Sequence, residues 1–151
     1  MFQLENEKRK AVIYLPYEDN EKLTKIKKNT LLKFCKDNDL DVIKVIEDYA
    51  TQDLWLWNDG TAELYDFVVK NEKDYPIILV YSIEDLSFCI NDSYVKAVQL
   101  QDYGDIHTIK EGSFVSDCEF DVNYKPIWVD EEKAFYHKYL IEEENLWWKR
   151  L

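Results

Sequence analysis

The sequence has few arginines, glycines and prolines. Arginine occurs only at Arg9 and Arg150, and glycine and proline occur three times each. Because affinity for a phosphate backbone comes largely from lysine and arginine, a chain with a formal net charge of −12 is expected not to bind nucleic acid directly. No glycine-rich phosphate loop is present, which excludes nucleotide binding of the usual Rossmann or P-loop kind.

Cysteine, histidine and long apolar runs are also scarce. Cys35, Cys89 and Cys118 form an odd set without a short paired spacing, so we expect reduced thiols and a cytoplasmic protein. His107 and His137 share no metal-ligand spacing with each other or with a cysteine, and we expect neither a bound metal nor another cofactor. No apolar run approaches the roughly 20 residues that cross a bilayer, and the first residues show no secretory signal.

The composition is typical of a globular protein, and the charged residues are distributed unevenly along the chain. Hydrophobic residues make up 46% of the sequence, as in globular proteins, and the length of 151 residues predicts one domain spanning residues 1–151. Residues 1–50 hold ten Lys and Arg against ten Asp and Glu, whereas residues 51–151 hold nine against twenty-one. This acidic excess makes a basic protein partner plausible.

Apolar runs alternate with helical patterns along most of the chain. The runs end abruptly at polar residues, as buried parallel strands do. The strands are expected at about 11–15, 42–46, 77–81 and 106–109, and the helices at about 21–37, from Asp59 or Thr61 to the turn before Pro76, and from Asn91 or Asp92 to a C′ glycine at Gly104. The pattern predicts a three-layer α/β fold with a largely parallel central sheet of about four to five strands.

The last third of the chain has a different pattern. Phe114, Ser116, Cys118, Phe120 and Val122 alternate with Val115, Asp117, Glu119 and Asp121, which predicts a strand with one solvated face at an antiparallel edge. Asp130 is placed to cap a final helix that runs to about Arg150. We therefore assign the core to about 10–112, and a C-terminal edge strand and helix to 113–151.

Two segments carry a resemblance to a known family. Residues 14–18 read Tyr-Leu-Pro-Tyr-Glu, and residues 80–88 read Val-Tyr-Ser-Ile-Glu-Asp-Leu-Ser-Phe. With the order of elements around them, about 10–112 resembles the N-terminal catalytic domain of serine recombinases, the resolvase and invertase family. That family carries Tyr-x-Arg-Val-Ser after the first strand, whose serine attacks DNA, and approximately Val-Tyr-x-x-Asp-Arg-Leu-Ser-Arg after the third.

The same resemblance implies that the family's catalytic residues are replaced here. Pro16 and Glu18 stand where the first motif has its arginine and its nucleophilic serine. In the second motif Glu84 stands at the position of the family's aspartate. Asp85 and Phe88 stand in place of the two arginines. Attack on a phosphodiester needs a nucleophile and cations that stabilise the developing charge, so we expect no DNA cleavage and no enzyme activity by the family's mechanism.

Aromatic and acidic residues supply the candidate partner surface. Some of the tryptophans are expected to be exposed or to contact a partner, and core packing is an equal alternative. Three acidic residues on one face of the predicted edge strand could bind a basic partner, although exposed charge on an edge also prevents aggregation. These candidates are Trp55, Trp57, Asp117, Glu119, Asp121, Trp147 and Trp148.

The leading hypothesis is a catalytically inactive resolvase-like domain that regulates by protein–protein interaction, as a homodimer or with an active recombinase. One alternative is a small acidic inhibitor, of a phage or immunity type, that mimics nucleic acid. The other is a metal-dependent hydrolase or transferase that uses Glu18, Glu84 and Asp85, with Asp19 nearby, at the carboxyl ends of two strands. For those four acids the simpler interpretation is that they are solvated loop residues.

Overall fold

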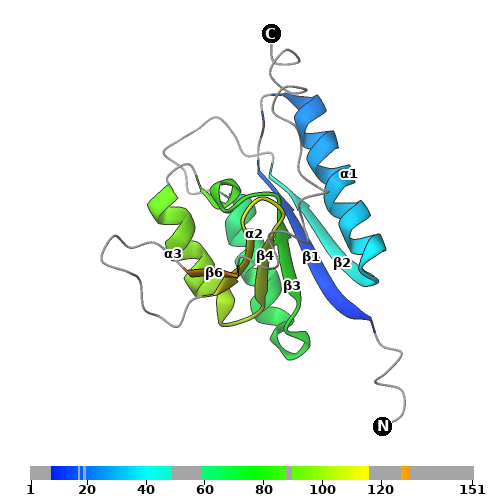
Figure 1. The fold of residues 1–151 in the computed structure, drawn as a ribbon. Coiled ribbons are helices and arrows are strands. Elements are labelled where there is room, and N and C mark those ends of the chain that lie inside the picture. Colours follow the sequence, from blue (N-terminus) through cyan, green and yellow to red (C-terminus); the bar gives the residue numbers. More distant parts are fainter. Residues whose placement is uncertain are drawn as a thin grey trace.

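The structure is a computed structural model that describes residues 8–16, 18, 20–48, 59–87, 90–115 and 127–129 (Figure 1). In chain order its elements are β1 (Arg9–Leu15), α1 (Glu21–Asp37), β2 (Leu40–Glu47), α2 (Asp59–Lys70), the short 3-10 helix η2 (Glu72–Asp74), β3 (Ile77–Val80), the short 3-10 helix η3 (Ile83–Leu86), α3 (Ile90–Gln101), β4 (Asp105–Thr108), β5 (Gly112–Val115) and β6 (Ile127–Val129). Within these described residues, no helix is long and apolar enough to cross a membrane.

All six strands belong to one sheet, in the order β2-β1-β3-β4-β5-β6. The first four are parallel, and β5 and β6 add antiparallel pairs at one end. This confirms the predicted α/β class and the largely parallel sheet. Of the predicted antiparallel strand only Phe114 and Val115 are described; they lie in β5, which is not at the edge, because β6 pairs with it there. The rest of that predicted strand and the final helix predicted from Asp130 lie outside the described residues.

Helices cover both faces of the sheet, which confirms the three-layer architecture (Figure 1). Side chains of β1 alternate between two buried clusters: Val12 and Tyr14 pack with residues of α2 and α3, and Ala11, Ile13 and Leu15 pack with residues of α1. Residues 11–15 are at most 1% exposed. A strand buried on both faces needs apolar residues at every position, which explains its continuous apolar run.

Polar residues define the helix ends. The Oδ1 atom of Asn20 accepts hydrogen bonds from the backbone N–H groups of Lys22 (2.9 Å) and Leu23 (3.4 Å), so Asn20 is the N-cap of α1. The prediction that Asn91 or Asp92 caps α3 is wrong, because α3 begins at Ile90. Asp92 lies instead in the first turn, where its carboxylate accepts a hydrogen bond from the Ser87 hydroxyl at 2.7 Å and pairs with Lys96 at 3.2 Å.

Gly104 follows α3 for a different reason from the predicted one. Its φ is not positive, so it is not a left-handed C′ residue; Gly112 is the one glycine with positive φ in the described residues. A Cβ at Gly104 would lie 2.4 Å from the carbonyl oxygen of Pro76, just before β3. Glycine is therefore required for the close approach of two backbones.

Replacing Gly104 by alanine should destabilise the domain by about 1–3 kcal/mol, because the backbone must shift to make room for the methyl group. Urea unfolding followed by circular dichroism measures the loss. Asp102→Ala is the control, since Asp102 is exposed and lies two residues earlier. Equal unfolding midpoints for the two variants would contradict the close approach.

Candidate functional site

The acidic residues predicted to meet at the strand ends come from two neighbouring strands. Glu18 follows β1, and Glu84 and Asp85 lie in η3, which follows β3. Because β1 and β3 are paired and parallel, their carboxyl ends share one edge of the sheet. Glu18 and Asp85 meet there through a shared partner, whereas the Glu84 side chain is exposed. Pro16 is half-buried directly after β1.

The remaining predicted site residues lie outside the described part of the chain, so the structure does not test their placement. They are Asp19, Trp55, Trp57, Phe88, Asp117, Glu119, Asp121, Trp147 and Trp148.

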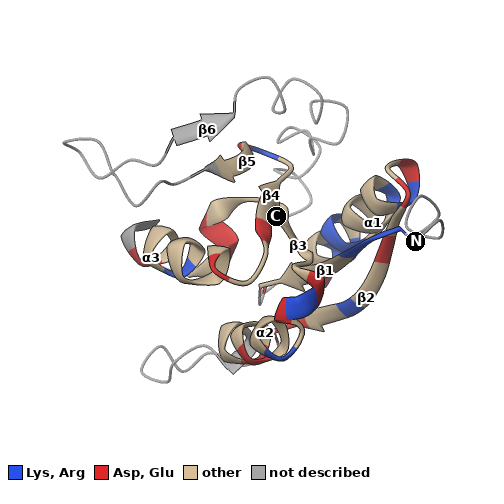
Figure 2. Ribbon diagram, turned by 90° about the horizontal axis from the view of Figure 1, so that it is seen from below, with Lys and Arg blue, Asp and Glu red and all other residues tan. Residues whose placement is uncertain are grey.

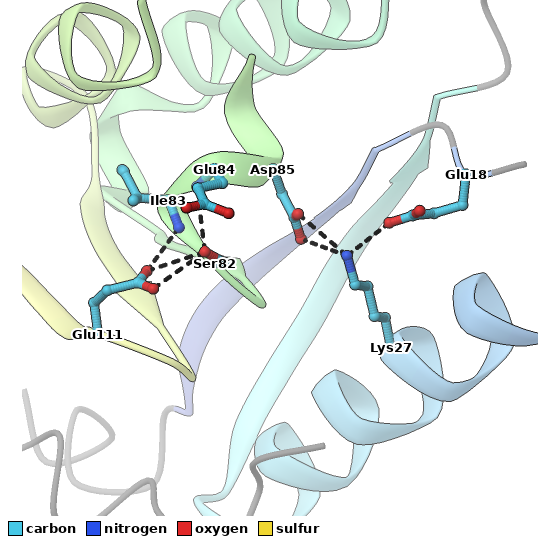
Figure 3. A network of polar contacts seen from close by, with 7 residues as sticks. All are labelled: Glu18, Lys27, Ser82, Ile83, Glu84, Asp85 and Glu111. Atoms are coloured by element: carbon cyan, nitrogen blue, oxygen red, sulfur yellow. Dashed lines mark hydrogen bonds and ion pairs between the residues drawn. The ribbon is translucent and has the colours of Figure 1, made fainter. Parts of the chain in front are cut away.

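The shared partner is Lys27 of α1 (Figure 3). Its Nζ atom lies 2.7 Å from Oε1 of Glu18, and 3.2 and 3.3 Å from the two carboxylate oxygens of Asp85. The side chains are 10% exposed for Lys27, 22% for Glu18 and 11% for Asp85. We call these three residues the Lys27 cluster. The sequence left two interpretations open for the strand-end acids, metal ligands or solvated loop residues; Glu18 and Asp85 are instead largely buried and share the ammonium of Lys27.

Lys27 is buried because of its place on α1. Leu23, Lys27 and Leu31 follow one another at four-residue intervals, so all three lie on the face that packs against the sheet. The ammonium group also lies 5.7 Å from the centre of the Tyr81 ring, within the range of a cation–π contact. A lysine in the middle of an apolar stripe is thus a signal for a buried ion pair, and the sequence contained it.

The pKa values of the cluster follow from burial and from two carboxylates that share one ammonium. Burial raises the pKa of Asp85 to about 6; Lys27 acts against this rise, and the negative charges of Glu18 and Glu111 add to it. Burial lowers the pKa of Lys27, but Asp85 and Glu18 together outweigh burial and leave it above its usual value. Lys27 is therefore a cation at neutral pH, and its charge is already neutralised inside the protein.

A second polar network holds η3 in place. Glu111, in the turn between β4 and β5, accepts hydrogen bonds from the backbone N–H of Ile83 at 2.7 Å and from the Ser82 hydroxyl at 3.1 Å (Figure 3). Ser82 in turn accepts from the N–H of Glu84 at 3.3 Å. The donors at the start of η3 are therefore already hydrogen-bonded to the carboxylate of Glu111. This contact fixes the segment that carries Asp85.

Other polar or reactive residues have structural surroundings. The Tyr14 hydroxyl, fully buried on β1, donates a hydrogen bond to Asp48 after β2 at 3.0 Å. His107 on β4 lies 3.1 Å from the Ser113 hydroxyl on β5, and burial lowers its pKa, as expected of a structural histidine. Cys35 is buried, and burial raises the pKa of its thiol to about 11, which disfavours the nucleophilic thiolate at neutral pH.

Metal binding finds no support in the described geometry. Across residues 8–115, apart from the gaps given above, and 127–129, no group of three or more His, Cys, Asp or Glu side chains could hold a metal ion. The Lys27 ammonium lies where a cation between Glu18 and Asp85 would bind. A divalent ion would have to displace it.

Several solved structures have a similar fold. The catalytic domain of TP901-1 integrase matches with a TM-score of 0.54 at 16% identity, covering 93% of this chain and 96% of that one. A resolvase family site-specific recombinase from Streptococcus pneumoniae matches with a TM-score of 0.57 at 16% identity, covering 95% and 93%. The catalytic domain of ISC1926 TnpA, an IS607-like serine recombinase, matches with a TM-score of 0.52 at 19% identity, covering 66% and 69%.

The chain has the fold of a serine recombinase catalytic domain. No protein-family model matches it, and no curated protein sequence matches it significantly. The resemblance noted on residues 14–18 and 80–88 is thus confirmed at the level of fold. In this resolvase-like domain the Lys27 cluster joins the segment after β1 to the segment after β3, which are the segments that carried the resemblance.

Proposed function

We propose that this resolvase-like domain is catalytically inactive and acts by binding another protein, in a regulatory role. One observation supports catalytic inactivity: the Lys27 cluster joins Glu18 to Asp85 at the strand ends that correspond to the two motifs. Under that correspondence, the carboxylate of Glu18 replaces the nucleophile, and the carboxylate of Asp85 replaces a cation. When fully ionised, the cluster has two negative charges and one positive charge. Such a cluster repels phosphate and offers no hydroxyl for attack.

The two alternatives have less support. For a metal-dependent hydrolase, Lys27 competes directly with the metal, and Glu84 does not join the cluster. For an acidic inhibitor that mimics nucleic acid, the net charge is suitable, but the acidic residues that would form the mimic lie outside the described residues. The inactive, partner-binding domain therefore remains the better proposal.

Incubating the full chain with supercoiled plasmid should give neither nicked DNA nor a covalent protein–DNA adduct on a denaturing gel. The expected absence follows from the lack of a hydroxyl nucleophile and of uncompensated cations in the Lys27 cluster. An active serine recombinase run in parallel serves as the positive control. A covalent adduct that disappears in Glu18→Gln would contradict catalytic inactivity.

The partner-binding part of the proposal has a separate test. A tagged chain recovered from native cytosol should bring down a protein in fixed proportion, with no nucleic acid in the eluate. A chain recovered alone, or with nucleic acid only, would contradict it.

A further inference from the structure

The outer face of α1 carries a row of lysines that the Lys27 cluster does not use. At 100° per residue the positions of this row fall within about 80° of the helix circumference, and they span about 21 Å along its axis. The row consists of Lys22, Lys25, Asn29, Lys33 and Lys36, all exposed, and we call it the lysine stripe. In Figure 2, α1 is the helix on which blue segments recur, in a chain of net charge −12.

Among the described residues, most lysines of the lysine stripe have no ion-pair partner. Lys33 pairs with Asp37 at 2.9 Å, but the side chains of Lys22, Lys25 and Lys36 have no ion pair with any described residue. Acidic residues already provide the net charge that keeps a small domain soluble. The lysine stripe therefore gathers positive charge on one helix face of an acidic chain, over a distance longer than the screening length of about 8 Å at physiological salt.

The borders of the stripe are apolar. Ile26 and Leu32 are half-buried and lie on its two sides, so each leaves some apolar surface beside the lysine stems. A partner helix with carboxylates along one row and apolar side chains beside it would match both features, as charged rows flank apolar seams in coiled coils. A phosphate backbone would leave the apolar borders without contacts, and the stripe has no arginine for bidentate phosphate binding.

We propose that the outer face of α1 is a docking surface for an acidic amphipathic helix of a partner protein. Carboxylates of that helix face the lysine stripe, and its apolar side chains contact Ile26 and Leu32. The inference rests on the partner-binding part of the proposed function and names its surface. Lys27 lies on the opposite side of α1, so docking leaves the Lys27 cluster intact.

The test uses a synthetic helical peptide with glutamates at the three- and four-residue spacing of the stripe and leucines beside them. Binding to the isotope-labelled full chain is followed by NMR shifts, and affinity by fluorescence anisotropy. The stripe variant carries Lys22→Glu, Lys25→Glu and Lys36→Glu. The matched control carries Lys70→Glu, Lys73→Glu and Lys110→Glu, three exposed lysines on other segments, so that both variants have the same net charge.

The peptide should shift amides on the outer face of α1, and its affinity should fall at least about tenfold in the stripe variant and by less than about twofold in the control. A scrambled peptide of the same composition should bind more weakly than the patterned one. Equal losses in the two variants would show an effect of net charge alone and would overturn the inference. Tighter binding of a DNA duplex to the same face would replace the protein partner by nucleic acid.

The outcomes also separate this inference from the proposed function. If the stripe variant retains a partner that the wild-type chain binds, the docking surface is wrong while partner binding stands. If the chain forms a covalent DNA adduct, catalytic inactivity fails, and the peptide result still decides whether α1 docks an acidic helix.

Discussion

Replacing Lys27 by methionine should lower the free energy of unfolding by about 3–5 kcal/mol, because the change leaves two largely buried carboxylates without their shared cation. Methionine keeps most of the length of the side chain, so the loss reports charge rather than an empty volume. Urea unfolding at pH 7 measures it. Lowering the pH to 5 should reduce the loss, since without Lys27 the pKa of Asp85 rises further and the protonated form avoids the buried charge.

The control for this prediction is the neighbouring lysine. Lys28→Met removes an ion pair with Glu47 of 2.8 Å whose lysine is 39% exposed, and such pairs contribute about 1 kcal/mol or less. Adding Asp85→Asn to the Lys27→Met variant should recover part of the lost stability, because it removes one of the two unpaired charges. Equal destabilisation by Lys27→Met and Lys28→Met would show that the cluster is no more than a surface ion pair.

The strands could be predicted from the sequence because burial on both faces requires a continuous run of apolar residues. β1 and β3 are covered on both faces, so each position is apolar and each run stops where the chain leaves the sheet. The position of Glu18 and Asp85 at one edge followed from the same reasoning, since neighbouring parallel strands end on the same side. The order and direction of the strands were enough to predict that these carboxylates lie at the same edge of the sheet.

Lys27 could not be assigned by the same reasoning, because its partners come from segments far along the chain. A lysine on a helix usually faces solvent, and only its alignment with Leu23 and Leu31 distinguishes it from the lysines of the stripe. Even this alignment does not identify Asp85, which is 58 residues away and comes close only when α1 packs on the sheet. Burial of a charge depends on tertiary packing, which local periodicity does not record.

β6 is too short to be predicted from the sequence. Ile127–Val129 has only three residues, too few to show either alternation or a continuous apolar run. Its pairing with β5 is non-local, since Phe114 lies opposite Trp128. The antiparallel character of β5 was therefore predictable from local pattern, whereas its place inside the sheet was not.

The contribution of Asp85 to stability should fall by about 3 kcal/mol as the pH rises from about 4 to 7, because its pKa is 3.8 in the unfolded chain and about 6 in the folded one. Between these values the folded state holds a proton on Asp85 that the unfolded state has lost. The free energy of unfolding therefore falls with rising pH over this interval. Subtracting the pH profile of Asp85→Asn from that of the wild type isolates this effect from the other titrating groups.

Asp92→Asn supplies a control with the opposite sign. The Ser87 hydroxyl and Lys96 lower the pKa of Asp92, so its contribution to stability is present at neutral pH and is lost as the pH falls through that lowered value. The two difference profiles should slope in opposite directions. A flat difference profile between the wild type and Asp85→Asn would mean that pairing with Lys27 fully compensates for the burial of Asp85. A falling difference profile would show that the burial of Asp85 outweighs its pairing with Lys27, an ammonium that it shares with Glu18 in the structure.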